Sequence, residues 1–102
     1  MSSTPETVEP GQVWRDKDER SKGAGEFVVR AFPQVDSYHA IDRSLAPTDE
    51  RFQRAYDWCE KARSRGLAGK VAIVERLGGH FSRIRVDRLL KGRDYEYIGR
   101  QR

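Results

Sequence analysis

Basic side chains are concentrated near two tyrosines in the C-terminal third of the chain. Residues 66–102 hold nine basic and four acidic side chains, within a formal net charge of +4 for the whole chain. Cations track a phosphate backbone, and exposed aromatic rings can stack on bases. The candidate nucleic-acid-binding residues are Arg83, Arg85, Arg88, Lys91, Arg93, Tyr95 and Tyr97. The alternative is that Arg83 and Arg85 pair with acids such as Glu75 and that the tyrosines pack in the core.

A second basic stripe is expected on one face of a helix. Apolar residues recur at helical spacing from Asp49 to about Arg65, with Thr48 as a suitable N-cap and Gly66 as a C-terminal stop. The stripe beside the apolar face consists of Arg51, Arg54, Trp58, Lys61 and Arg65. Because Trp and Arg are enriched among interface hot spots, the stripe is a candidate partner-binding surface. Ordinary ion pairs on a solvated helix face would explain the same pattern.

Few residues suggest catalysis or metal binding. Cys59 falls on the apolar face of the expected helix, where a small buried thiol is the common outcome, and nothing places His39 or His80 beside it. One cysteine and two histidines do not supply the four ligands of a zinc site. We therefore expect a non-enzymatic protein with no metal, cofactor or small-molecule substrate.

Length and composition predict one small domain. The chain has 102 residues, of which 36% are hydrophobic and 35% charged. This allows a single modest core and excludes a two-lobed enzyme. One cysteine and the lack of a long apolar run argue against a secreted, disulfide-linked or membrane-spanning protein. We expect a soluble cytoplasmic protein whose pI of about 9.5 favours polyanions or acidic protein surfaces as partners.

The strands that would position the arginines form a predicted hairpin. Two β-branched runs, 70–77 and 80–87, flank Gly78-Gly79, which favours a tight primed turn. Alternation along the second run places Ile84 on one face and Arg83 with Arg85 on the other. One face of the sheet should therefore be apolar and the other basic.

The other elements complete a mainly β (α+β) fold. Further strands are predicted at 12–15, 26–32, 37–41 and 94–98, with a polar loop at 16–23 and a helical turn at 87–92. The pattern predicts a small SH3-like, partly open antiparallel barrel of five to six strands with one inserted α-helix. Residues 1–10 should be a disordered tail and residues 11–100 the domain, with the helical insertion at about 48–65 and Trp14 in the core.

The two ends of this domain resemble a known group of proteins. The matching segments are GQVWRD at 11–16 with Asp18, Arg20 and Gly23, FVV at 27–29, RIRVDRL at 83–89 and YEYIG at 95–99. They are similar to small uncharacterised proteins from actinobacteria and their phages. The resemblance implies an actinobacterial host and a phage or mobile-element origin, and it carries over no catalytic residue.

Two functions follow from these observations. The first is a nucleic-acid- or nucleoprotein-binding module that uses the basic face of the hairpin. The second is a protein-interaction module, such as a phage-encoded modulator of a host protein, that docks through the helix around Trp58. A winged helix-turn-helix with residues 71–77 helical is a third interpretation, which the β-branched residues of that segment disfavour.

Overall fold

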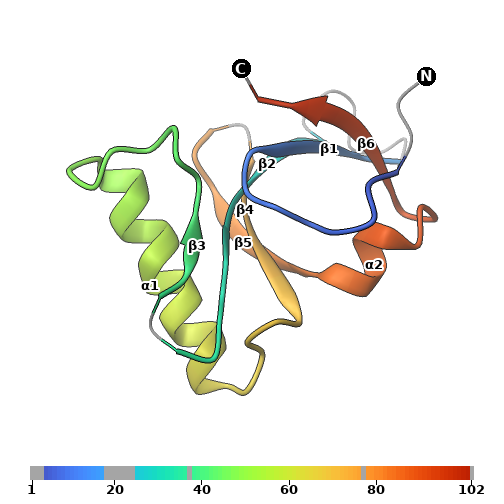
Figure 1. The fold of residues 1–102 in the computed structure, drawn as a ribbon. Coiled ribbons are helices and arrows are strands. Elements are labelled where there is room, and N and C mark those ends of the chain that lie inside the picture. The colour runs from blue at the N-terminus through green and yellow to red at the C-terminus, as the bar shows by residue number, and fades with distance from the viewer. Residues whose placement is uncertain (1–3, 18–24, 37, 77, 102) are drawn as a thin grey trace.

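The protein is built on one antiparallel sheet with a helix at each side. The computed structural model describes residues 4–17, 25–36, 38–76 and 78–101. Its elements are β1 (Gln12–Asp16), β2 (Glu26–Phe32), β3 (Ala40–Ile41), α1 (Glu50–Ser64), β4 (Val71–Arg76), β5 (Phe81–Arg85), α2 (Val86–Leu90) and β6 (Tyr95–Arg100). The strand order is β5-β4-β2-β1-β6, and β3 pairs with β2. Figure 1 shows α1 beside β3 and α2 below β6. The mainly β class is confirmed, and β5 and β6 are the two edges of a sheet that is not closed.

The main core lies on one face of the sheet and contains the residue that we expected to anchor it. Trp14 is fully buried, and its indole Nε1 donates to Gln12 Oε1 at 3.2 Å. The ring of Tyr97 meets that of Trp14 edge-on, with the ring centroids 5.3 Å apart. Tyr95 meets Phe27 in the same way at 5.6 Å. Such edge-to-face pairs add about 0.5–1.5 kcal/mol to the burial of the rings.

The segment before Gly11 joins this core, which corrects the predicted disordered tail for its described part. Val8 is only 7% exposed and packs in the main core. The side-chain amide of Gln12 donates to the Thr7 carbonyl, and Glu9 pairs with Arg100. A single valine among proline and polar residues forms no periodic pattern, so this contact could not be predicted from the sequence. Residues 1–3 lie outside the described part of the chain.

A β-bulge at Arg30 lets β2 contribute to two cores. Val29 is opposite Val74, and Ala31 is opposite Ile73, so Arg30 is an extra residue on β2. Val29 therefore packs in the main core, whereas Ala31 packs with Ile73 in a second core on the other face of the sheet.

Helix α1 covers the second core with residues at helical spacing. Ala55, Cys59 and Ala62 are fully buried on its inner face. The predicted bounds are close to those observed, but the N-cap is Asp49 and not Thr48. The Asp49 carboxylate accepts the backbone N–H of Arg51 at 2.9 Å and so satisfies one of the unpaired donors of the first turn.

The predicted hairpin is confirmed, with shorter arms. Gly78 and Gly79 have φ of 91° and 84°, as a primed turn requires. Val86 starts α2 instead of extending β5. The winged-helix interpretation is wrong because Val71–Arg76 is a strand paired with β2 and β5. The polar loop predicted at 16–23 lies mostly outside the described residues. Among all the residues that the structure describes, no helix is long and apolar enough to span a membrane.

Candidate nucleic-acid interface

Arg83 and Arg85 lie on the same face of the sheet as α1. Arg83 is opposite Ile73 and Arg85 is opposite Val71 in the antiparallel ladder of β4 and β5. Opposite residues share a face, and Ile73 belongs to the core under α1. Both arginine side chains are exposed. The basic row predicted on the hairpin therefore lies on the side of the sheet that carries the basic helix.

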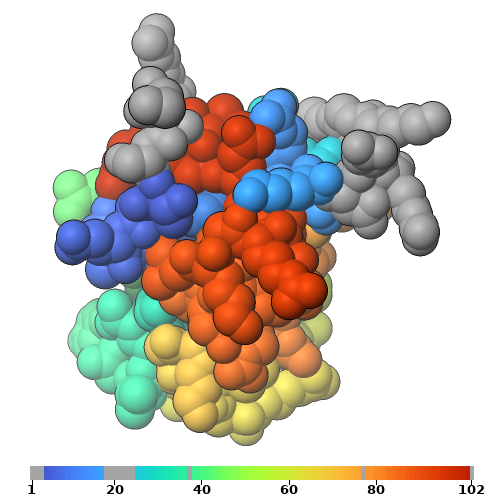
Figure 2. Space-filling model, turned by 90° about the vertical axis from the view of Figure 1, so that its right-hand side faces the viewer, coloured from blue at the N-terminus to red at the C-terminus, as the bar shows by residue number. Residues whose placement is uncertain are grey.

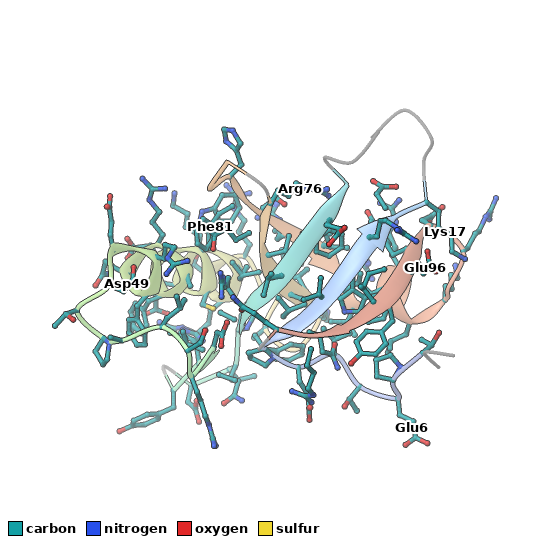
Figure 3. The ribbon with its side chains drawn as sticks, turned by 90° about the horizontal axis from the view of Figure 1, so that it is seen from above. Glu6, Lys17, Asp49, Arg76, Phe81 and Glu96 are labelled. Atoms are coloured by element: carbon teal, nitrogen blue, oxygen red, sulfur yellow. The ribbon has the colours of Figure 1, made fainter. Side chains whose placement is uncertain are left out.

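The helix stripe meets β5 at Phe81. Trp58 and Phe81 are both half-buried and pack against the second core, and Figure 3 shows Phe81 beside α1. A hollow of about 370 Å³ lies between the two elements. It is lined by Arg54, Asp57, Trp58, Lys61, Gly79, His80 and Phe81. The ammonium of Lys61 lies 6.0 Å from the centroid of the Trp58 ring, which is within cation–π range.

A second hollow of about 540 Å³ lies along β5 at the edge of the sheet, and residues from both faces of that strand line it. It is lined by Leu67, Val71, Arg76, Ser82, Arg83, Ile84, Arg85, Arg88 and Tyr95. The buried hydroxyl oxygen of Ser82 has no hydrogen-bond partner in the described part of the chain. We use the name α1–β5 surface for the side chains of α1 and β5 that line these hollows and lie on the side of the sheet that carries α1: Arg54, Trp58, Lys61, Phe81, Arg83 and Arg85.

Few acids neutralise the cations of this surface. Arg83 and Lys61 form no ion pair with any described residue, and Arg85 lies 3.3 Å from Asp87 in a pair that is exposed on both sides. Such exposed pairs contribute about 0–1 kcal/mol, so Arg85 can exchange its partner at little cost. Glu75 pairs with neither Arg83 nor Arg85, because Arg30 occupies it instead.

The two tyrosines do not lie on this surface, which corrects their expected stacking role. Tyr95 is only 8% exposed, and Tyr97 is half-buried against Trp14. Strand alternation points both rings of β6 toward the main core. The rings on the α1–β5 surface are Trp58 and Phe81. Phe81 was not predicted to bind, although its alternation with Arg83 and Arg85 was the signal that could have identified it.

The other predicted nucleic-acid-binding residues, Arg88, Lys91 and Arg93, lie in α2 and in the turn after it. Arg88 comes from α2, which with the turn after it occupies the centre of the face in Figure 2. Arg88 lies 3.5 Å from Asp94 and also lines the second hollow. Lys91 and Arg93 are exposed in the turn after α2 and line neither hollow.

Two of the predicted helix residues lie outside the α1–β5 surface. Arg51 pairs with Asp49, the cap of its own helix. Arg65 is the exposed C-cap of α1 and continues the helical row of Arg54, Trp58 and Lys61. Arg54 itself lies 3.4 Å from Glu50 in an ordinary i, i+4 pair, whereas Asp57 accepts from Gln53 and forms no pair with Lys61.

The nucleophilic and basic side chains around α1 are Cys59, which is buried, and His39, whose two ring nitrogens are both hydrogen-bonded. Burial raises the pKa of the Cys59 thiol to about 12, so the thiol is protonated at neutral pH. His39 Nδ1 accepts the backbone N–H of Gln34 at 3.0 Å, which leaves Nε2 to donate to Glu60 at 3.1 Å. Among the described residues, no three His, Cys, Asp or Glu side chains are grouped to hold a metal ion.

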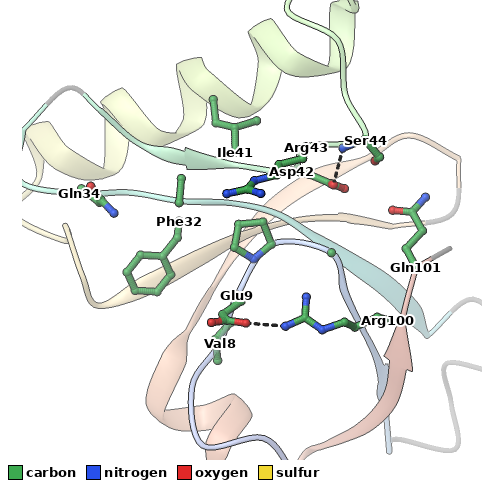
Figure 4. A pocket seen from close by; sticks show the side chains of 13 residues that line it. Val8, Glu9, Phe32, Gln34, Ile41, Asp42, Arg43, Ser44, Arg100 and Gln101 are labelled. Atoms are coloured by element: carbon green, nitrogen blue, oxygen red, sulfur yellow. Dashed lines mark hydrogen bonds and ion pairs between the residues drawn. The ribbon is translucent and has the colours of Figure 1, made fainter.

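A further hollow, of about 750 Å³, lies away from the α1–β5 surface and shares no lining residue with it (Figure 4). The N-terminal segment, β3 and the end of β6 surround it. Three of its charged side chains are engaged within the protein, because Glu9 pairs with Arg100 and Asp42 accepts from Arg30 and from the Ser44 backbone. Because this hollow is separate from the α1–β5 surface, Arg43 and Arg100 on its rim are suitable control positions for substitutions of Arg83 and Arg85.

Comparison with known proteins adds no assignment to this geometry. No family model matches the chain, and no curated protein or solved structure matches it. The resemblance to actinobacterial and phage proteins stays a prediction.

Proposed function

We propose that this protein is a small non-enzymatic module that binds nucleic acid, or a nucleoprotein, through the α1–β5 surface. The observation that carries the proposal is the meeting of two basic rows, one on α1 and one on β5, beside the rings of Trp58 and Phe81. Cations spaced along a groove follow a phosphate chain, and the aromatic rings between them accept bases.

We also infer that the scaffold is an SH3-like, partly open barrel with α1 inserted between its strands. The strand order β5-β4-β2-β1-β6 and the short helix α2 between β5 and β6 support this inference. Because function lies in the site rather than in the fold, the barrel itself adds nothing to the choice of ligand.

The test of the proposed function is the salt dependence of binding by the double variant Arg83→Ala/Arg85→Ala. Affinity for a fluorescent oligonucleotide is measured by anisotropy between 50 and 200 mM salt. Each phosphate contact on a single strand contributes about 0.7 to the slope of log K against log salt concentration, so losing two should flatten the slope by about 1.4. The matched control, Arg43→Ala/Arg100→Ala, removes the same charge from the distant rim and should keep the wild-type slope.

A protein partner is the second candidate function, favoured by the free edge of the sheet at β5. The outward N–H and C=O groups of an edge strand can pair with an added strand from another chain. On this account a purified partner would bind with little salt dependence and would survive nuclease treatment. Equal slopes for the wild type and for the Arg83/Arg85 variant would reject phosphate binding at this surface and leave the protein partner.

A further inference from the structure

The hollow between α1 and β5 contains a carboxylate among its cations. Asp57 lines it together with Arg54 and Lys61, one turn before and one turn after along the helix. One Asp57 oxygen accepts from the side-chain amide of Gln53 at 2.9 Å, and the other has no partner among the described residues. A carboxylate repels a phosphate but accepts hydrogen bonds from the N–H groups at the edge of a base. The inside of this hollow therefore suits a base better than a phosphate.

The aromatic lining and the size of the hollow fit one base. Trp58 lines it from α1 and Phe81 from β5, and both residues are partly exposed. Its volume of about 370 Å³ is near the lower end of the range of about 300–1,000 Å³ for small-ligand pockets. A ring that stacks on Trp58 would also lie near the ammonium of Lys61.

The phosphates on either side of such a base have positions of their own. Arg54 and Lys61 are exposed and line the hollow beside Asp57, so they can hold the phosphates next to the bound base. Arg83 follows Phe81 by one alternation on the same face of β5, so it is the next cation along that strand for a phosphate of a chain that leaves the hollow. The surface thus separates a base position from a row of phosphate positions.

We propose that the hollow between α1 and β5 binds one unpaired base of a single-stranded nucleic acid, with guanine preferred. The inference rests on the proposed function and adds the state of the strand and the identity of one base. A base inside a duplex is stacked and paired, so its edge and faces cannot reach Trp58 and Asp57 without being flipped out. Guanine presents two adjacent donors, N1–H and the N2 amino group, to the free oxygen of Asp57.

The test compares two strands that carry the same phosphates. One is an eight-nucleotide deoxythymidine strand, and the other is the same strand with one deoxyguanosine at its centre. The wild type should bind the guanine-containing strand more tightly by a factor on the order of ten. Asp57→Asn should reduce this preference to within about twofold while the affinity for the thymidine strand stays similar. Asp36→Asn, at an exposed site on the β2–β3 loop, is the matched control and should keep the full preference.

Tryptophan fluorescence supplies a second readout that does not depend on the Asp57 variant. Trp14 is fully buried, so the signal lost in Trp58→Phe reports the half-buried ring of Trp58. Stacking of the bound base should quench this part of the fluorescence in the wild type.

The outcomes separate this inference from the proposed function. Salt-dependent binding of both strands with equal affinity, and with Trp58 unquenched, would overturn the base site and keep the phosphate-binding function. Tighter binding of a duplex than of either single strand would overturn it as well. Absence of binding to every strand would overturn both.

Discussion

Arg30 is a buried cation whose partners come from three parts of the chain. Its guanidinium is 2.6 Å from Asp42, 2.8 Å from Glu75 and 2.8 Å from the side chain of Gln101. The residue is only 5% exposed. A buried charge is tolerated when it is paired and hydrogen-bonded. The cluster therefore ties β2 to β4, to the segment after β3 and to the C-terminal end.

We predict that Arg30→Ala destabilises the fold by about 3–5 kcal/mol, because the buried Asp42 and the partly buried Glu75 would lose their counter-charge. Urea unfolding followed by circular dichroism measures the change in the free energy of unfolding. Arg43→Ala, at an exposed site, should change it by no more than about 0.5 kcal/mol. Equal effects of the two variants would show that the Arg30 cluster does not contribute to stability.

Glu60 should make stability fall in acid. Arg63, and after it His39, lower the pKa of Glu60 from its usual 4.5 to about 2. Between these two values the unfolded chain binds the proton and the folded chain does not, so this contribution is complete above pH 4.5 and is lost as the pH falls toward 2. As the pH falls from 4.5 toward 2, the free energy of unfolding should decrease less for Glu60→Gln than for the wild type.

Urea unfolding between pH 2 and pH 6 measures this difference. Glu26→Gln removes an exposed carboxylate from β2 and should follow the wild-type profile. Parallel profiles of the wild type and Glu60→Gln would contradict the assigned role of Glu60.

Burial could be predicted from the sequence where a residue belongs to a periodic pattern. Trp14 on an alternating run and Cys59 on an apolar helix face were both expected inside, and both are fully buried. Val8 and Arg30 were missed, because the contacts of each depend on segments far away in the chain. The same limit applies to the α1–β5 surface. Its two halves were each predicted, but their meeting at Phe81 depends on how α1 packs on the sheet.

At the scale of elements, the β4–β5 hairpin sets the position of the arginines. Its turn places Phe81 opposite Glu75, and with it Arg83 opposite Ile73. A shift of one residue in this register would turn Arg83 and Arg85 to the core face. The glycine pair and the β-branched runs made this hairpin predictable, whereas the bulge in β2 has no comparable signal in the sequence.

We predict that Gly79→Ala destabilises the protein by about 1–2 kcal/mol, because φ of 84° is costly for a residue with a Cβ. No atom lies within 4 Å of a Cβ at this site, so the cost is in the backbone and not in a clash. Gly79→Asn should cost less, since asparagine tolerates positive φ better than alanine. Thermal unfolding compares the two variants, and a greater loss for asparagine would contradict the proposed cause.

At the scale of the whole molecule, stability and binding use different parts of the structure. The main core and the Arg30 cluster hold the sheet together, while the α1–β5 surface presents its cations on the opposite face to the main core. Alanine substitutions of Arg83 and Arg85 should therefore weaken binding and leave the free energy of unfolding nearly unchanged.

The central claim is that nucleic acid binds along α1 and β5, and amide chemical-shift mapping by NMR tests it most directly. On addition of the guanine-containing strand, the largest shifts should lie in residues 54–65 and 79–85 and should shrink as salt is added. Shifts centred on the hollow between the N-terminal segment, β3 and the end of β6, or no shifts at all, would contradict the account.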